Sequence, residues 1–167
     1  MTRLTLDALN AADRKTFVSA LAGVFEDSPW IVERTWLQRP FATLEHLHRA
    51  MTAEIDRAPR DEQLSLLRAH PDLGARETMS TQSMSEQSGA GLTRLGDSDL
   101  AKLRHLNAAY RQKFGFPFLF AVKGSSPRDV LTALEQRLAA TSDTEFNEAV
   151  RQVHKIGRIR LQALIAT

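Results

Sequence analysis

Apolar residues recur with the 3.6-residue spacing of an α-helix along nearly the whole chain, and this pattern constrains the fold more than any other feature. Ser, Thr and Asp stand where N-caps are expected, and Pro and Gly interrupt the pattern between segments. The sequence therefore predicts an all-α fold, a single-domain bundle of about eight helices covering residues 1–167. The expected helices lie within 13–25, 28–40, 43–59, 64–70, 82–88, 97–115, 125–138 and 142–167.

One apolar stretch, residues 116–122, has no helical period. Its sequence is Phe-Pro-Phe-Leu-Phe-Ala-Val, and Gly115 and Gly124 flank it. A single strand would have no sheet partner in an otherwise helical chain. We therefore expect a short, buried, extended connector between two helices.

Composition excludes several classes of protein. The 167 residues include no Cys, so disulfide scaffolds, zinc–thiolate sites and cysteine nucleophiles are excluded. The net charge is only +2, and acidic and basic residues are interspersed until the C-terminal segment, which argues against nucleic-acid binding. We see neither a signal peptide nor an apolar run of the roughly 18–20 residues that cross a bilayer. We expect a cytoplasmic protein with no membrane contact.

Arg160 breaks the pattern of the last predicted helix, because it falls on the apolar stripe that includes Ile156 and Gly157. An inward guanidinium needs an anion or several acceptors, since an unpaired buried charge costs several kcal/mol. Gly157, one turn away, is expected to leave open space beside it. Two interpretations stay open: Arg160 binds a ligand, or it snorkels or pairs with an internal carboxylate.

His70 is followed by Pro71, which ends the preceding helix and fixes the path by which the chain leaves it. The helix dipole favours the imidazolium form, and burial opposes it, so the pKa of His70 is expected near neutrality. Such a histidine suits acid–base catalysis at neutral pH. A histidine that only caps the helix is the alternative.

A third polar cluster comprises Ser83, Glu86 and Gln87, followed by Gly89-Ala90-Gly91. A hydroxyl, a carboxylate and an amide within five residues could bind a small, polar, urea-like ligand. Ser-x-x-Glu is also a capping-box pattern, so a purely structural role is the alternative. Motifs for a metal, a nucleotide or a serine nucleophile are missing, and His46 and His48 point in different directions on a helix.

Taken together and in order, several motifs resemble the family of 2-oxo-4-hydroxy-4-carboxy-5-ureidoimidazoline (OHCU) decarboxylases of the urate-to-allantoin pathway. The resemblance spans essentially the whole chain. The motifs are Glu26-x-Ser28-Pro29-Trp30, His70-Pro71-Asp72-Leu73-Gly74, Ser83-x-x-Glu86-Gln87, Gly89-Ala90-Gly91-Leu92, Asn107-x-x-Tyr110, Phe114-Gly115-Phe116-Pro117-Phe118 and Ile156-x-x-Ile159-Arg160-Leu161.

The resemblance implies an all-α lyase that needs no metal or organic cofactor and converts OHCU to (S)-allantoin. It implies His70 as the catalytic acid or base, assisted by Glu86. Pro71 would line the site, and Arg160 would be its guanidinium. The implied substrate contacts are Ser83, Glu86, Gln87 and the backbone of Phe118, Leu119, Phe120, Ala121 and Val122.

The resemblance also implies a homodimer as a possible assembly and hydroxyisourate hydrolase as the neighbouring enzyme of the pathway. The main alternative is a helical binding or partner-docking module without catalysis, and a nucleic-acid module is a weaker one. The presence together of His70, Glu86, Gln87 and Arg160 disfavours a docking module, because a scaffold gains nothing from an inward arginine.

Overall fold

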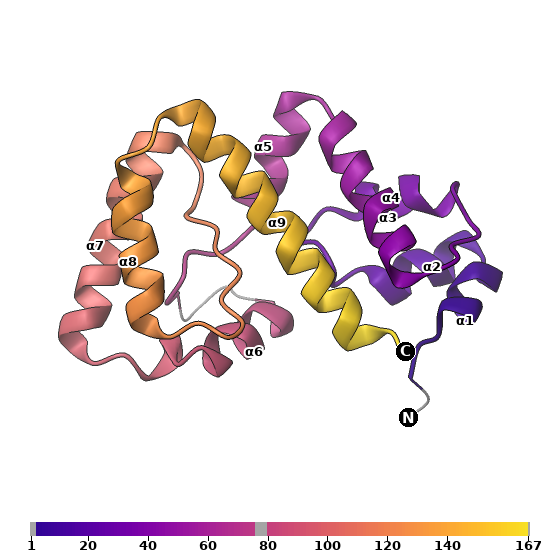
Figure 1. The fold of residues 1–167 in the computed structure, drawn as a ribbon, viewed down its shortest axis with the longest axis horizontal. Helices are drawn as coiled ribbons and strands as arrows, with labels where there is room; N and C mark the ends of the chain where they lie inside the picture. The colour runs from indigo at the N-terminus through magenta and orange to yellow at the C-terminus, as the bar shows by residue number, and fades with distance from the viewer. Residues whose placement is uncertain (1–2, 76–79, 167) are drawn as a thin grey trace. The chain divides into compact units, whose positions relative to one another are not determined.

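A computed structural model describes residues 3–75 and 80–166 (Figure 1). In this part of the chain the prediction of an all-α fold is confirmed, since the structure holds nine α-helices, one 3₁₀ turn and a single isolated bridge, Leu4–Ile165. The α-helices are α1 (Leu6–Ala11), α2 (Arg14–Leu21), α3 (Pro29–Trp36), α4 (Leu44–Arg57), α5 (Arg60–Arg68), α6 (Thr81–Gly89), α7 (Asp97–Phe114), α8 (Pro127–Leu138) and α9 (Ser142–Leu164), and the 3₁₀ turn is η1 (Leu92–Arg94).

Side-chain caps set most of the helix starts. Asp13 and Thr43 accept hydrogen bonds from backbone N–H groups of α2 and α4, as predicted. The prediction was wrong at the end of the first expected helix: α2 stops at Leu21, and Val24 and Phe25 are buried outside it. Helix α1 was missed, because it is six residues long and buries only Leu9.

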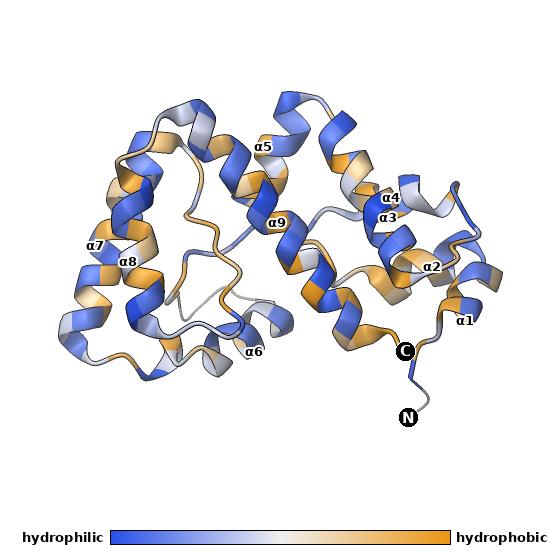
Figure 2. Ribbon diagram, viewed as in Figure 1, coloured by the Kyte–Doolittle hydropathy of each residue, from blue (hydrophilic) through white to orange (hydrophobic). Residues whose placement is uncertain are grey.

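The chain divides into two compact units. The first contains Met1–Ala69 and His154–Thr167. Its core is built from α2, α3 and α4, whose apolar faces are completely buried at Phe17, Ile31 and Met51. The second half of α9 alternates polar and apolar residues, as an amphipathic helix does, and buries Leu161 (Figure 2).

The second unit, His70–Val153, contains α6, η1, α7, α8 and the first half of α9. Residues 116–122 form neither helix nor strand, which confirms the predicted connector between α7 and α8. Two of their aromatic side chains pack on the fully buried Tyr110 of α7, with ring-centroid distances of 5.9 Å to Phe116 and 5.4 Å to Phe118. Aromatic packing therefore takes the place that strand pairing would have in a sheet.

The segment Ser142-Asp143-Thr144-Glu145 has the spacing of a capping box but does not form one. Ser142 is already helical, and the hydroxyl that caps α9 is that of Thr141, which accepts from Thr144 N at 3.4 Å. Glu145 is consequently not a capping residue, and only 1% of its surface is exposed. No helix among the described residues has both the length and the apolar character needed to cross a bilayer.

Gly157 lies in a tight contact rather than beside open space, which corrects the expectation from the sequence. A Cβ atom at this position would lie 2.7 Å from the Cε1 and Cζ atoms of Phe25. The Phe25 ring is 2% exposed and has little room to move. Glycine is thus required here for close packing of the ring against α9.

We expect Gly157→Ala to lower the free energy of unfolding by about 1–3 kcal/mol, since overpacking of a filled core costs that much. The higher helix propensity of Ala offsets only part of this loss. Urea denaturation followed by circular dichroism measures the difference. Gly89→Ala is the matched control, because a Cβ there meets nothing within 4 Å. Equal stability of both variants would show that Phe25 yields to the added methyl group.

Candidate active site

His70 lies just after α5 rather than at its cap. Helix α5 ends at Arg68, and Ala69 is the C-cap, with its N–H directed at the carbonyl oxygens of Ser65 and Leu67. A side chain one residue beyond the C-cap can still bond the last carbonyl oxygens of a helix, so both interpretations of His70 stay open. His70 is buried, at 5% exposure, and Pro71 is half-buried. The imidazole of His70 therefore stands at the start of an irregular segment, where solvent has little access to it.

Ser83, Glu86 and Gln87 lie inside α6 instead of capping it. The N-cap is Ser80, whose hydroxyl accepts from Ser83 N at 3.1 Å, so the capping-box alternative for Ser83 and Glu86 is wrong. Their spacing of i, i+3 and i+4 places the three side chains on one helix face. Ser83 and Gln87 are buried and Glu86 is half-buried. The polar face of α6 is thus turned inward, which an ordinary surface helix avoids.

Two side chains hold the segment after His70 in place. Sequence reasoning did not predict this role for either of them. Gln87 Oε1 accepts a hydrogen bond of 2.8 Å from Gly74 N. Asn107 Nδ2, on α7, donates one of 2.8 Å to Leu73 O. Gly74 has φ +80°, and a Cβ there would lie 2.8 Å from Leu103 Cδ2. The His70–Gly74 segment is therefore fixed to both α6 and α7.

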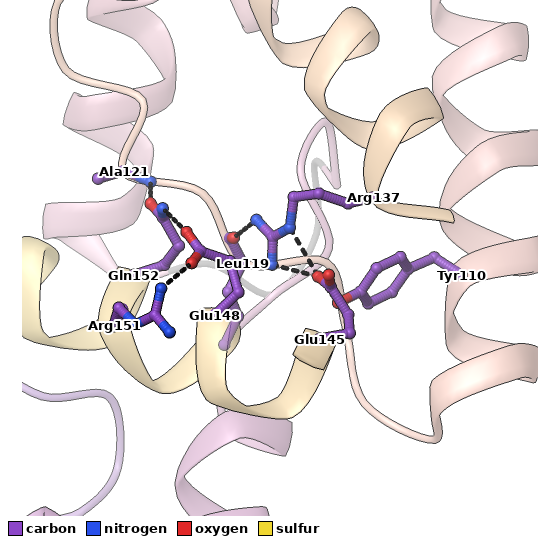
Figure 3. A network of polar contacts seen from close by, with 8 residues as sticks. All are labelled: Tyr110, Leu119, Ala121, Arg137, Glu145, Glu148, Arg151 and Gln152. Atoms are coloured by element: carbon purple, nitrogen blue, oxygen red, sulfur yellow. Dashed lines mark hydrogen bonds and ion pairs between the residues drawn. The ribbon is translucent and has the colours of Figure 1, made fainter. Parts of the chain in front are cut away.

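The connector 118–122 is also held through its backbone. Leu119 O accepts from Arg137 Nη1 of α8, and Ala121 N donates to Gln152 Oε1 of α9 at 2.9 Å (Figure 3). Val122 O accepts from Ser125 N at 2.9 Å. Phe118, Leu119 and Val122 are buried, and Phe120 and Ala121 are half-buried. Of the five predicted backbone positions, three thus have one peptide group engaged by the protein.

Behind the connector lies a buried carboxylate, that of Glu145. It accepts from Arg137 Nε at 2.6 Å and also pairs with Arg137 Nη2 and the Tyr110 hydroxyl (Figure 3). Burial, and then the hydrogen bond to Glu145, raise the pKa of Tyr110. The phenol therefore stays protonated and donates. The Arg137 guanidinium also lies 4.5 Å from the centroid of the Phe118 ring.

Arg160 belongs to the other compact unit and is buried there, at 5% exposure, so its predicted inward direction is confirmed. Its Nη2 lies 3.0 Å from Glu26 Oε1, and its Nη1 donates to Gly23 O at 3.2 Å. Pairing with an internal carboxylate was one of the two interpretations left open. Glu26 is itself 9% exposed, so the pair is withdrawn from water.

Among the described residues, no group of three or more His, Asp or Glu side chains is arranged to hold a metal ion. In the first unit, His154 Nε2 lies 3.1 Å from Asp56 Oδ1, and His154 O lies 2.8 Å from His48 Nε2. Burial lowers the pKa of His154, against the opposing effect of Asp56.

A surface cleft of about 330 Å³ is lined by residues of α7 and α8. Its lining is mostly exposed and charged, and it includes the ion pair of Lys102 with Glu135, 2.6 Å apart. None of its lining residues is a predicted site residue. The candidate site is therefore defined by the buried polar side chains and not by this cleft.

Comparison with known proteins shows what the chain resembles. Residues 10–162 match the family model of OHCU decarboxylase. A 2-oxo-4-hydroxy-4-carboxy-5-ureidoimidazoline decarboxylase of Halalkalicoccus jeotgali is 44% identical over 164 residues, which cover 98% of this chain and 93% of that protein. The uric acid degradation bifunctional protein PucL of Bacillus subtilis is 42% identical over 96% of this chain, which spans only 33% of PucL.

A solved structure supports the same relationship. The crystal structure of an (S)-allantoin synthase superposes with a TM-score of 0.78 and 32% sequence identity. The match covers 98% of this chain and 55% of that protein. Similarity therefore extends over the whole fold and is not confined to short motifs.

We expect Gln87→Met to lower the free energy of unfolding by about 1–3 kcal/mol, the usual cost of leaving a buried donor, here Gly74 N–H, without its acceptor. Urea denaturation of the purified protein measures this change. Gln112→Met is the matched control, because Gln112 is exposed on α7. The tether would be energetically unimportant if both variants unfolded at the wild-type urea concentration.

Proposed function

This chain belongs to the OHCU decarboxylase family, and on that premise we propose that it converts OHCU to (S)-allantoin and CO₂ in urate degradation without a cofactor. The single observation that carries this proposal is the family match over residues 10–162. The buried polar residues in the regions of the predicted site support it. Burying a polar side chain costs free energy, and binding a polar substrate would account for that cost here.

The reaction suits a site built from ordinary side chains. The carboxylate of OHCU is attached to a ring carbon that also carries a hydroxyl group. When the carbon–carbon bond to the carboxylate breaks, its electron pair passes into the conjugated ring, and CO₂ leaves. A proton is then added to one face of the ring, which sets the S configuration. The protein must orient the carboxylate out of the ring plane, exclude water and manage one proton.

We assign proton transfer to His70, and to Glu86 the orientation of the substrate beside it. Pro71 would line the site. Ser83 and Gln87 would hydrogen-bond the hydantoin and ureido groups, Gln87 through its NH₂ group, since its Oε1 is bonded to Gly74. Arg160 would bind an anionic or carbonyl oxygen of the substrate. A positioned acid or base contributes roughly 10²–10⁴-fold to such a rate.

The backbone of the connector would hydrogen-bond the ring. In an extended chain, alternate residues direct their N–H and C=O groups to the same side. Leu119 and Ala121 direct theirs at Arg137 and Gln152. We therefore assign the ring contact to the peptide groups of Phe120, which an extended backbone would direct to the opposite side. Fixed donors near developing negative charge typically lower a barrier by ~2.7–4 kcal/mol each.

Three further properties are proposed. We infer functional coupling to hydroxyisourate hydrolase, which supplies the substrate of this step; the similarity to a bifunctional uric acid degradation protein supports such coupling. A homodimer and a cytoplasmic location stay predictions from the sequence. Sedimentation of the purified chain tests the first of these, and fractionation of cells tests the second.

To test the activity, OHCU is generated from urate in situ. Its ultraviolet absorbance and the optical activity of the product are then followed with and without the chain. With the chain present, OHCU should decay faster and yield the S enantiomer. A spontaneous rate and a racemic product would instead favour the alternative of a non-catalytic helical docking module.

We expect His70→Ala to lower kcat by about 10²- to 10⁴-fold, because the acid or base is lost. The helical signal in circular dichroism should persist. The control is His105→Ala, since His105 is exposed on α7 and should be replaceable without loss of turnover. Near-normal activity of His70→Ala would remove His70 from the chemistry.

We expect Arg160→Lys to lower kcat/KM, because a compact ammonium cannot reproduce the planar fork of donors that a guanidinium offers. Kinetics with OHCU measure the loss. Arg158→Lys makes the same change on the same helix, at an exposed arginine that pairs with Glu45 at 2.8 Å, and should have no effect. If kcat/KM of Arg160→Lys equals that of the wild type, the pair with Glu26 is only structural.

A further inference from the structure

The connector 118–122 has no regular secondary structure, yet its backbone is held at two residues. Arg137 of α8 donates to Leu119 O, and Gln152 of α9 accepts from Ala121 N at 2.9 Å (Figure 3). Leu119 and Ala121 are two residues apart, which is the repeat of an extended chain. Two side chains from different helices thus take the place of a neighbouring strand.

Both side chains are themselves fixed. Arg137 directs Nε and Nη2 at the Glu145 carboxylate, and this leaves Nη1 aimed at Leu119 O. Glu145 is 1% exposed and also accepts from Tyr110. Gln152 Nε2 donates to Glu148 Oε1 at 2.9 Å, which orients Gln152 Oε1 toward Ala121 N. Neither tether can rotate away without breaking a second bond.

We propose that Arg137 and Gln152 are positioning residues of the decarboxylation, acting through the connector and not through contact with the substrate. They hold Leu119 and Ala121, and they thereby place the Phe120 peptide groups that the ring would contact. This inference rests on the proposed function. Its physical reason is that displacement of a reacting group by about 1 Å can cost about 100-fold in rate.

Arginine suits the first tether better than lysine. A guanidinium has five N–H donors in a fixed plane, so it can satisfy a carboxylate on one edge and a carbonyl on the other. An ammonium at the end of a flexible chain cannot hold both acceptors in the same geometry. Arg137→Lys should therefore keep the buried charge beside Glu145 and lose the rigid link to Leu119.

A merely structural role would have a different signature. Every variant of the Glu145 cluster would then lower the melting temperature, and turnover per folded molecule would stay constant. Tyr110→Phe removes one bond to Glu145 and leaves both connector tethers in place, so it measures the structural effect alone. Positioning predicts that kcat falls much further in Arg137→Lys and Gln152→Met than in Tyr110→Phe at a comparable melting temperature.

The experiment compares wild type, Arg137→Lys, Gln152→Met, Tyr110→Phe and Lys113→Met. Lys113 is exposed and donates to Leu138 O, so its loss removes a cation–carbonyl bond elsewhere in the same unit and should change nothing. Melting temperature, kcat and KM with OHCU, and amide hydrogen exchange of residues 116–122 are measured. We expect kcat about 10- to 100-fold lower and faster connector exchange in the two tether variants. Gln152→Met leaves the buried ion pair intact and serves alone where Arg137→Lys does not fold.

Amide hydrogen exchange and turnover distinguish failure of the proposed decarboxylase activity from failure of the positioning role of Arg137 and Gln152. An inactive wild type would defeat the proposed function, and exchange would still report whether the tethers hold the connector. Unchanged exchange in both tether variants would overturn the positioning role, whatever the activity. Faster exchange with unchanged kcat would also overturn it, because the connector would then be held without consequence for the reaction.

Discussion

The buried carboxylate of Glu145 is the constraint on which the second unit depends. A carboxylate with 1% exposure is tolerated only when it is paired, and loss of one partner of such a pair typically costs about 3–5 kcal/mol. Its partners, Arg137 and Tyr110, come from α8 and α7. Three helices must therefore meet at one point, and the connector between α7 and α8 is bound to that point through Leu119.

Sequence reasoning succeeded where local physics decides the structure. Periodic apolar faces and capping residues predicted most helices, and the missing period over 116–122 predicted the connector. It failed where local and tertiary demands conflict. Ser142-x-x-Glu145 satisfies the capping-box pattern, but Thr141 caps α9, and Glu145 is instead the partner of Arg137. A local motif cannot reveal that competition.

In the candidate site, too, local features could be predicted from the sequence and tertiary contacts could not. Helical phase alone indicated that Arg160 points inward, and its partner Glu26 lies 134 residues away, beyond any local pattern. Ser83 and Glu86 could have been caps, and only the position of Ser80 at the start of α6 excludes this. The tethers from Gln87 and Asn107 to residues 73 and 74 depend on how α6 and α7 pack, so no spacing in the sequence predicts them.

Two irregular segments of the second unit, residues 70–74 and 116–122, are held by side chains in the same way. Ordering the backbone of one residue costs roughly 1–2 kcal/mol, and irregular segments lack the ladder bonds that offset this cost in helices and sheets. Here side chains supply those bonds, at Leu73 and Gly74 and again at Leu119 and Ala121. Donors and acceptors that are already fixed need no reorganisation when charge develops on a substrate. If these groups contact the substrate as proposed, the cost of ordering them is met by folding rather than during each turnover.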